Sequence, residues 1–185
     1  WEEALECFGE TKNEGEDMYL MYVNIGFCYI EMLMEMPRDE TGELQINADN
    51  IETIVEYVLQ IERSLAKLVE LFEQNPNSTH LLMAGHFLQI LIRVCCLKFS
   101  FYNKQEMWEL SDSVERTIKQ HQLLHHALIR SLKKSTELPE WEKIRETEFG
   151  KLTVQEIDAN VNLQEWAQKF FSHLIKEKAE IRNDK

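Results

Sequence analysis

The spacing of apolar residues between positions 50 and 74 constrains the fold of this chain most strongly. Nine apolar side chains recur there at the positions of a single helix face: Ile51, Ile54, Val55, Val58, Ile61, Leu65, Leu68, Val69 and Phe72. A strand would instead alternate apolar and polar residues, and no segment shows convincing alternation. The whole chain also holds only 6 Gly and 3 Pro to form tight turns. We therefore expect an all-α fold.

The same reasoning predicts about seven helices along the chain. We expect them at residues 2–12, 17–36, 50–74, 79–101, 104–134, 139–150 and 161–181. Long helices joined by short turns favour antiparallel neighbours, either in a helical bundle or in a short helical-repeat solenoid. At 185 residues the chain is long enough for one domain with a real core, so we expect residues 1–185 to form a single domain.

Several residues mark where these helices should begin and end. The second helix stops at Pro37, and residues 37–49 form the one long irregular connection. Asp49 or Asn50 can cap the helix that follows. Pro139 suits the first turn of the sixth helix, and Gly150 can end it.

The first residue indicates that the sequence is a fragment of a larger protein. Trp1 rather than Met begins the chain, inside a run with helical character. The alternative is a disordered N-terminal segment that is missing from the sequence.

A repeat-like pattern lies at residues 1–33. Tyr22, Gly26 and Tyr29 follow the large-x-x-x-Gly-x-x-Tyr spacing, and Ala4 stands 22 − 4 = 18 residues before Tyr22. This pattern resembles helices B and A of successive tetratricopeptide repeats, whose period is about 34 residues. The resemblance implies a right-handed superhelix whose concave groove binds peptides or partner proteins. Arg38 departs from it, since the family would place Ala there.

The acidity of the chain belongs to its first part. The formal net charge is −13, and residues 1–74 carry 18 acids and 4 bases, a net of −14. Residues 75–185 carry 15 acids and 16 bases, a net of +1. Nucleic acid is disfavoured as a partner of the first part, because phosphates would be repelled. A basic protein partner is compatible with it, as is a solvated acidic surface that only keeps the chain soluble.

A polar stripe interrupts the most apolar segment. His86, Gln89 and Arg93 are three and four residues apart, so they share a face of the expected helix at 79–101. An Arg on a nearly buried helix needs a partner for its charge. Arg93 could pair with a Glu of the acidic first part, or the stripe could line a groove that holds a carboxylate or the backbone of a partner.

The expected helix at 104–134 carries an unusual run of basic residues. Between positions 116 and 134 there is no acid, and five cations occur: Arg116, Lys119, Arg130, Lys133 and Lys134. Cations near the C-terminus of a helix stabilise its dipole, which would explain the last three. Alternatively, the cluster docks an acidic protein segment or nucleic acid.

Aromatic residues provide the remaining candidate contacts. Trp141 lies among charged residues in a short polar segment, as an interface anchor would. Trp166 and Phe170 belong to an apolar face so wide that the last helix can pack on two neighbours or on another chain.

We expect no catalytic residue, no metal and no cofactor. His121 and His125 have the spacing of a helical zinc pair, but the sequence contains neither an H-E-x-x-H motif nor a C-x-x-C motif to complete a site. It contains no Gly-rich phosphate loop and no G-x-S-x-G motif. The cysteines (Cys7, Cys28, Cys95 and Cys96) fall in helical patterns, so we expect free buried thiols in a reducing compartment, cytoplasmic or nuclear. We expect no signal peptide and no membrane span.

The sequence therefore predicts a non-enzymatic protein-interaction scaffold. It would bind a partner helix or peptide, or associate with further copies of itself. The alternatives are a nucleic-acid-associated module that uses the basic helix at 116–134, and an acidic chaperone-like binder of a basic protein.

Overall fold

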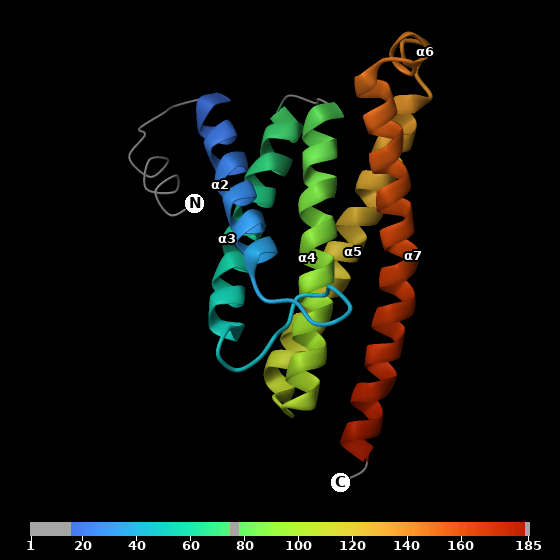
Figure 1. Ribbon diagram of the computed structural model, residues 1–185. Helices are drawn as coiled ribbons and strands as arrows, with labels where there is room; N and C mark the ends of the chain where they lie inside the picture. The colour runs from blue at the N-terminus through green and yellow to red at the C-terminus, as the bar shows by residue number, and fades with distance from the viewer. Residues whose placement is uncertain (1–15, 75–77, 184–185) are drawn as a thin grey trace. The chain divides into compact units, whose positions relative to one another are not determined.

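The computed structural model describes residues 16–74 and 78–183, and within these ranges the chain forms six helices and no strand (Figure 1). They are α2 (Glu16–Glu35), α3 (Ile51–Gln74), α4 (Ser78–Lys104), α5 (Trp108–Thr136), α6 (Trp141–Ile144) and α7 (Glu148–Asn183). The all-α prediction is confirmed. The helix predicted at 2–12 lies outside the described residues. The chain divides into two compact units, residues 1–80 and 81–185, and the prediction of one domain stays a prediction.

The first unit is built on the hairpin of α2 and α3. The amphipathic face predicted for residues 50–74 is mostly confirmed, because Ile54, Val58 and Ile61 are all buried. Between the two helices, the rings of Tyr29 and Tyr57 lie 5.4 Å apart. This buried face leaves the opposite side of α3, which is rich in Glu, exposed to solvent.

The connection between α2 and α3 holds a cap that differs from the prediction. Asn47, which the sequence did not single out, accepts two of the capping hydrogen bonds: its Oδ1 accepts from the backbone N–H of Asp49 at 2.9 Å and of Asn50 at 3.1 Å. Asn50 reciprocates, since its Oδ1 accepts from the backbone N–H of Asn47 at 2.9 Å. This is the reciprocal arrangement of a capping box. It starts the turn leading into α3 three residues earlier than the sequence indicates.

We expect Asn47→Ala to destabilise the first unit by about 1 kcal/mol, the usual effect of removing a capping side chain. Thermal unfolding followed by circular dichroism measures the change. Asp49→Ala is the matched control and should have a smaller effect, because its side chain accepts neither capping bond. Equal losses in the two variants would show that Asn47 does not act as the cap.

The second unit packs three long helices side by side. α4 and α7 run parallel, since Phe99 packs against Phe171 with ring centres 5.7 Å apart while Gly85 meets Asn160 further back along both helices. α5 runs antiparallel to both. α4 supplies the largest group of fully buried side chains: Phe87, Leu88, Leu91, Ile92, Cys95, Cys96 and Phe99. By length and composition α4 could also cross a membrane, a test that the core helix of a soluble protein passes equally well.

The α4–α5 corner explains why α5 begins at Trp108 and not at 104. Glu106 adopts a positive φ of 57°. The backbone N–H of Met107 donates to Tyr102 O at 2.9 Å and that of Glu106 to Asn103 O at 3.1 Å. These two bonds form a Schellman motif, which ends a helix and is usually marked by Gly. With Glu in the left-handed position, the sequence carries no such mark.

The predicted helices differ most from the structure at the α6–α7 junction. The sixth helix has only four residues, and α7 begins at Glu148 rather than at 161. Thr147 caps α7, because its Oγ1 accepts from the backbone N–H of Gly150 at 3.1 Å. Gly150, predicted to end the sixth helix, lies in the first turn of α7. The missing Cβ is what lets this turn sit against the backbone of Ile144 and Arg145.

Three of the four cysteines fall within the described residues, and all three are free and buried, as predicted. Burial raises the pKa of the Cys96 thiol to about 12. A thiol this far from ionisation is a poor nucleophile, so Cys96 serves as a small apolar core residue.

Candidate functional site

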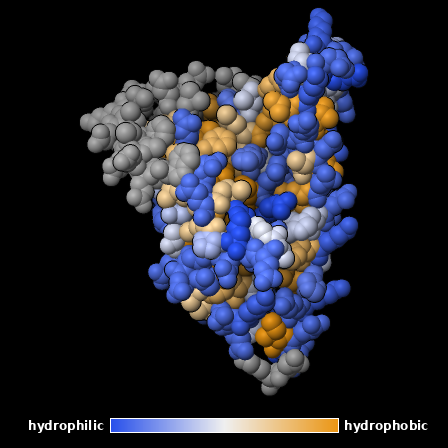
Figure 2. Space-filling view, in the orientation of Figure 1, coloured by the Kyte–Doolittle hydropathy of each residue, from blue (hydrophilic) through white to orange (hydrophobic). Residues whose placement is uncertain are grey.

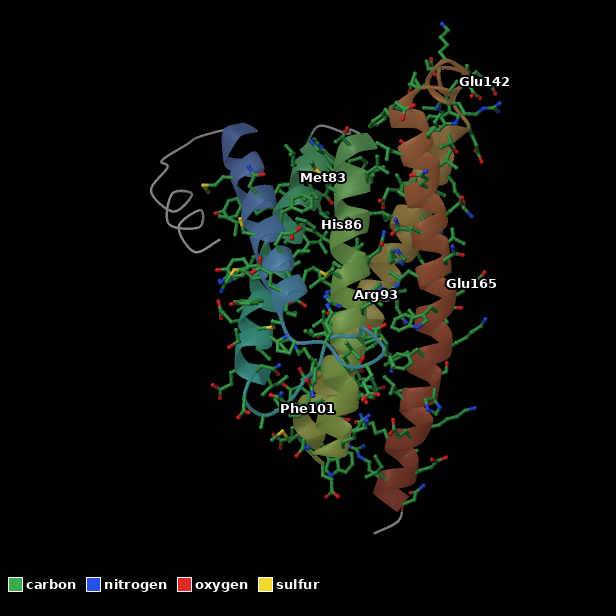
Figure 3. All side chains as sticks on the ribbon, in the orientation of Figure 1. Met83, His86, Arg93, Phe101, Glu142 and Glu165 are labelled. Atoms are coloured by element: carbon green, nitrogen blue, oxygen red, sulfur yellow. The ribbon has the colours of Figure 1, made fainter. Side chains whose placement is uncertain are left out.

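Two predicted groups of residues meet between α4 and α7. The guanidinium carbon of Arg93 lies 5.1 Å from the ring centre of Trp166, and the rings of Trp166 and Phe170 stack at 4.9 Å with an interplanar angle of 20°. Gln89, one turn before Arg93, donates from Nε2 to Glu156 Oε2 on α7 at 3.2 Å. Figure 3 shows Arg93 extending from α4 toward α7, while Glu165 points away from the helix pair.

The Arg93 side chain is not buried, contrary to the expectation for an Arg on an apolar helix. Arg93 is exposed, whereas Trp166 and Phe170 are half-buried. The face of the Trp166 ring attracts this charge, and such an attraction is worth about 0.5–1 kcal/mol at an exposed site. His86, the remaining member of the predicted stripe, is half-buried on α4. The pairing of Arg93 with a Glu of the first part stays a prediction.

The predicted cations of α5 all lie on its exposed side. We call this surface the basic face, made of Arg116, Lys119, Arg130, Lys133 and Lys134. At about 100° per residue, the five positions fall within an arc of roughly 100°. Lys119 pairs with Glu115 at 2.7 Å. The other four cations form no salt bridge with any residue that the structure describes.

Leu123 lies in the middle of the basic face, and sequence reasoning missed it. It is 71% exposed, the highest value among the large apolar residues of the described chain. Ala127, one turn further along, is exposed as well. The available signal was the spacing, since Leu123 stands seven residues after Arg116 and seven before Arg130. A helix keeps residues seven apart on the same face.

The opposite side of α5 is fixed in the second unit by a buried polar contact. The ring Nε2 of His125 lies 2.7 Å from Asn160 Oδ1 on α7, and Asn160 Nδ2 donates to Glu156 O at 2.7 Å. Because the amide oxygen accepts, this ring nitrogen is the donor. Burial lowers the pKa of His125 below its ordinary value, which keeps the ring neutral. The contact occupies Nε2 of His125 and leaves Nδ1 as the ring nitrogen that a metal pair with His121 would use.

An ionic cluster that the sequence did not predict joins the start of α5 to the last part of α7. Lys178 is 5% exposed, and its Nζ donates to Asp112 Oδ1 at 2.5 Å and to Glu115 Oε2 at 2.8 Å. The hydrogen bond from Lys178 holds the pKa of Asp112 below its ordinary value. Burial raises the pKa of Glu115, but hydrogen bonds from Lys119 and Lys178 outweigh it and leave that pKa lowered. The cluster fixes the start of α5 to α7, and the His125 contact fixes its middle.

Trp141 is half-buried in α6, and its role as an interface anchor stays a prediction. The segments around it expose several large apolar side chains: Leu138, Ile144, Phe149 and Leu152. In Figure 2 the outer edge along α7 is mainly hydrophilic, and hydrophobic residues gather near the end where α6 joins it. Charges of both signs surround these residues, so this end has no single electrostatic character.

No protein-family model, curated protein or solved structure was found to match this chain.

Proposed function

We propose that this chain is a non-enzymatic protein-interaction module whose basic face binds an acidic amphipathic helix. One observation carries the proposal: Leu123 is 71% exposed at the centre of five exposed cations on one helix face. A leucine this exposed contributes little to the packing of the second unit. Burying it in a complex would contribute about 1.5–3 kcal/mol.

The pattern of the basic face fits a helix better than an extended peptide. Arg116, Leu123, Arg130 and Lys134 form a stripe parallel to the axis of α5. A helix packed alongside presents its own side chains at matching intervals along such a stripe. Acidic residues on both sides of a leucine in the partner would then face cations, while the two leucines exclude water between them.

Nucleic acid is the weaker alternative for the same surface. Phosphate contacts need cations but gain nothing from an exposed leucine among them. The chain also carries a net charge of −13, which repels a polyanion at long range. A partner that presents acids on one helix face, and not along its whole length, avoids most of this repulsion.

The test uses three fluorescent probes: an acidic amphipathic peptide of Leu and Glu in heptads, a scrambled peptide of the same composition, and a DNA duplex. We expect the chain to bind the amphipathic peptide selectively, measured by fluorescence anisotropy. Leu123→Ser should weaken this binding about tenfold or more, since each 1.4 kcal/mol is a factor of ten. Lys133→Glu with Lys134→Glu should weaken it further and reduce its salt dependence.

Matched controls lie on α7, where Leu152 is 57% exposed and Lys169 and Lys176 are exposed. Leu152→Ser, and Lys169→Glu combined with Lys176→Glu, should leave binding unchanged. Equal binding of the scrambled peptide, or equal losses in the controls, would contradict the proposal. DNA binding that depends on Lys133 and Lys134 but not on Leu123 would favour the nucleic-acid alternative.

A further inference from the structure

We infer that the acidic helix that fits the basic face is α3 of a second copy of this chain. The inference rests on the proposed function and names the partner: a homo-oligomer in which α3 of one copy lies along α5 of another. Three observations support it, namely the composition of the exposed side of α3, the spacing of its charges, and the charge of the first unit.

The exposed side of α3 mirrors the composition of the basic face. We call it the acidic face; its exposed acids are Glu52, Glu56, Glu70 and Glu73. Two apolar residues lie among them, Val55 at 38% and Leu59 at 39% exposure. The exposure of Val55 corrects the sequence prediction, which placed it on the buried face; the other residues predicted there are buried or half-buried. Leu59 was not among the residues predicted to be buried. α3 thus presents acids around an exposed leucine, as α5 presents cations around Leu123.

The two faces share one spacing. On α3, Leu59 stands 7 residues after Glu52 and 11 before Glu70. On α5, Leu123 stands 7 residues after Arg116 and 11 before Lys134. The first and last residues of each set are 7 + 11 = 18 residues apart, which is five helical turns, and 7 residues are nearly two turns. Each set therefore forms a straight stripe along its helix. Two such helices placed side by side and parallel would pair all three positions at once.

This parallel register also places the remaining charges favourably. Arg63, the one cation within the acidic face, is level with the small Ala127 and avoids the cations of the basic face. Glu70 already pairs with Lys67 in its own chain at 2.9 Å. Both side chains are well exposed, and because such a pair contributes little free energy, Glu70 can pair with a cation of the other copy instead. In the antiparallel arrangement Leu59 would instead face Ala127, and the leucine contact would be lost.

The charge of the whole chain favours the same pairing. The net charge of −14 on residues 1–74 opposes a second acidic surface and attracts a basic one. The basic face supplies such a surface, because no other acid-free run of the sequence holds as many cations as residues 116–134. Association through different faces on the two copies is heterologous, so each copy offers one face of each kind.

Charge reversal on each face tests the pairing, with sedimentation velocity of the whole chain over a wide concentration range as the measurement. The apparent mass of the sedimenting wild-type species should rise with concentration above the 22.0 kDa of one copy. The variant Glu52→Lys, Glu70→Lys should stay monomeric, and so should the variant Arg116→Glu, Lys134→Glu. Mixing these two variants should restore association, and the chain carrying all four substitutions should associate with itself again.

Glu165→Lys with Glu180→Lys is the charge-matched control, because both residues are exposed on α7. It should associate like the wild type. The register is tested by mixing a Leu59→Cys chain with a Leu123→Cys chain under oxidising conditions, which should give a disulfide between copies. A Leu59→Cys chain mixed with an Ala127→Cys chain should cross-link less, and the reverse order would overturn the parallel register.

A wild-type chain that stays monomeric at every concentration overturns the inference, and so does association that survives both reversals. The outcome is separable from the proposed function. If the chain is monomeric but still binds the amphipathic peptide through Leu123, the proposed function stands and only the identity of the partner is wrong. If the peptide does not bind either, both are wrong.

Discussion

Replacing Asp112 and Glu115 together by Ala should destabilise the protein by about 3–5 kcal/mol, the usual effect of leaving a buried charge without its partner. Lys178 is the charge in question. Its side chain is 6% exposed and donates to both carboxylates, and its Nζ also lies 5.0 Å from the ring centre of Phe99. Without the two acids, the ammonium group keeps only this ring and must either attract water or lose its proton.

Substitution of the buried lysine itself separates a buried-charge effect from a general loss of packing. Lys178→Met keeps most of the apolar stem and removes the charge, and Asp112 at 50% and Glu115 at 22% exposure remain accessible to water. We expect Lys178→Met to change the free energy of unfolding by less than about 1.5 kcal/mol, as volume-conserving exchanges usually do. Added to the double Ala variant, it should restore most of the lost stability. A triple variant as unstable as the double variant would contradict the role given to Lys178.

The same cluster makes stability depend on acid. The folded pKa of Asp112 is lowered, chiefly by the hydrogen bond from Lys178. For Glu115, burial raises the pKa, but the hydrogen bonds from Lys119 and Lys178 leave it lowered. The contribution of both acids is therefore complete above the ordinary carboxyl pKa of about 4 and disappears as the pH falls through the lowered folded values. Denaturant unfolding at neutral and acidic pH should show a smaller acid loss in Lys178→Met than in the wild type.

The helices with the strongest periodicity were the best predicted from the sequence. The segment predicted at 50–74 differs from α3 by one residue at its start. The predictions failed where a boundary depends on a contact made in three dimensions. Glu106 ends α4 in a conformation normally marked by Gly, and the Thr147 cap starts α7 in a segment whose apolar pattern is weak. Apolar periodicity reports burial along a helix and carries little information on caps.

The candidate site was predicted in pieces. The sequence singled out Arg93 on one helix and Trp166 on another, and the structure brings the two together. Their pairing could not be predicted, because it depends on the register between α4 and α7. Leu123 and Lys178 were missed for opposite reasons. Leu123 is an apolar residue on the outer side of its helix, and Lys178 is a charged residue on the inner side. A rule that places apolar residues inside and charges outside overlooks both.

Gly150→Ala should be the most damaging addition of a single methyl group in the second unit, with a cost of more than about 3 kcal/mol, above the usual range for overpacking. A Cβ at this position would lie 2.1 Å from the carbonyl oxygen of Ile144 and 2.8 Å from the Cα of Arg145. Both are backbone atoms, so no rotamer change can relieve the clash. The α6–α7 turn would have to open, and the Thr147 cap on α7 would be lost with it.

Two controls distinguish this clash from other effects of substitution by Ala. Gly42 has a φ of +82°, and a Cβ added to it would meet no atom within 4 Å. Gly42→Ala should therefore cost only about 1–2 kcal/mol, from backbone strain alone. Gln155→Ala, at an exposed position of α7, should fall within about 0.5 kcal/mol of the wild type. Denaturant unfolding gives the three free energies, and a Gly150→Ala cost no larger than that of Gly42→Ala would contradict the clash.

Hydrogen exchange locates the damage that the Gly150→Ala methyl group causes. Residues 141–151 should lose protection first, whereas a uniform loss of protection would place the damage elsewhere. The contact of His125 with Asn160 lies further along the same helix pair and should persist. Its persistence would show that the two ends of the pair of α5 and α7 are stabilised independently, because the junction at α6 could then open without disturbing the contact that fixes the middle of α5 to α7.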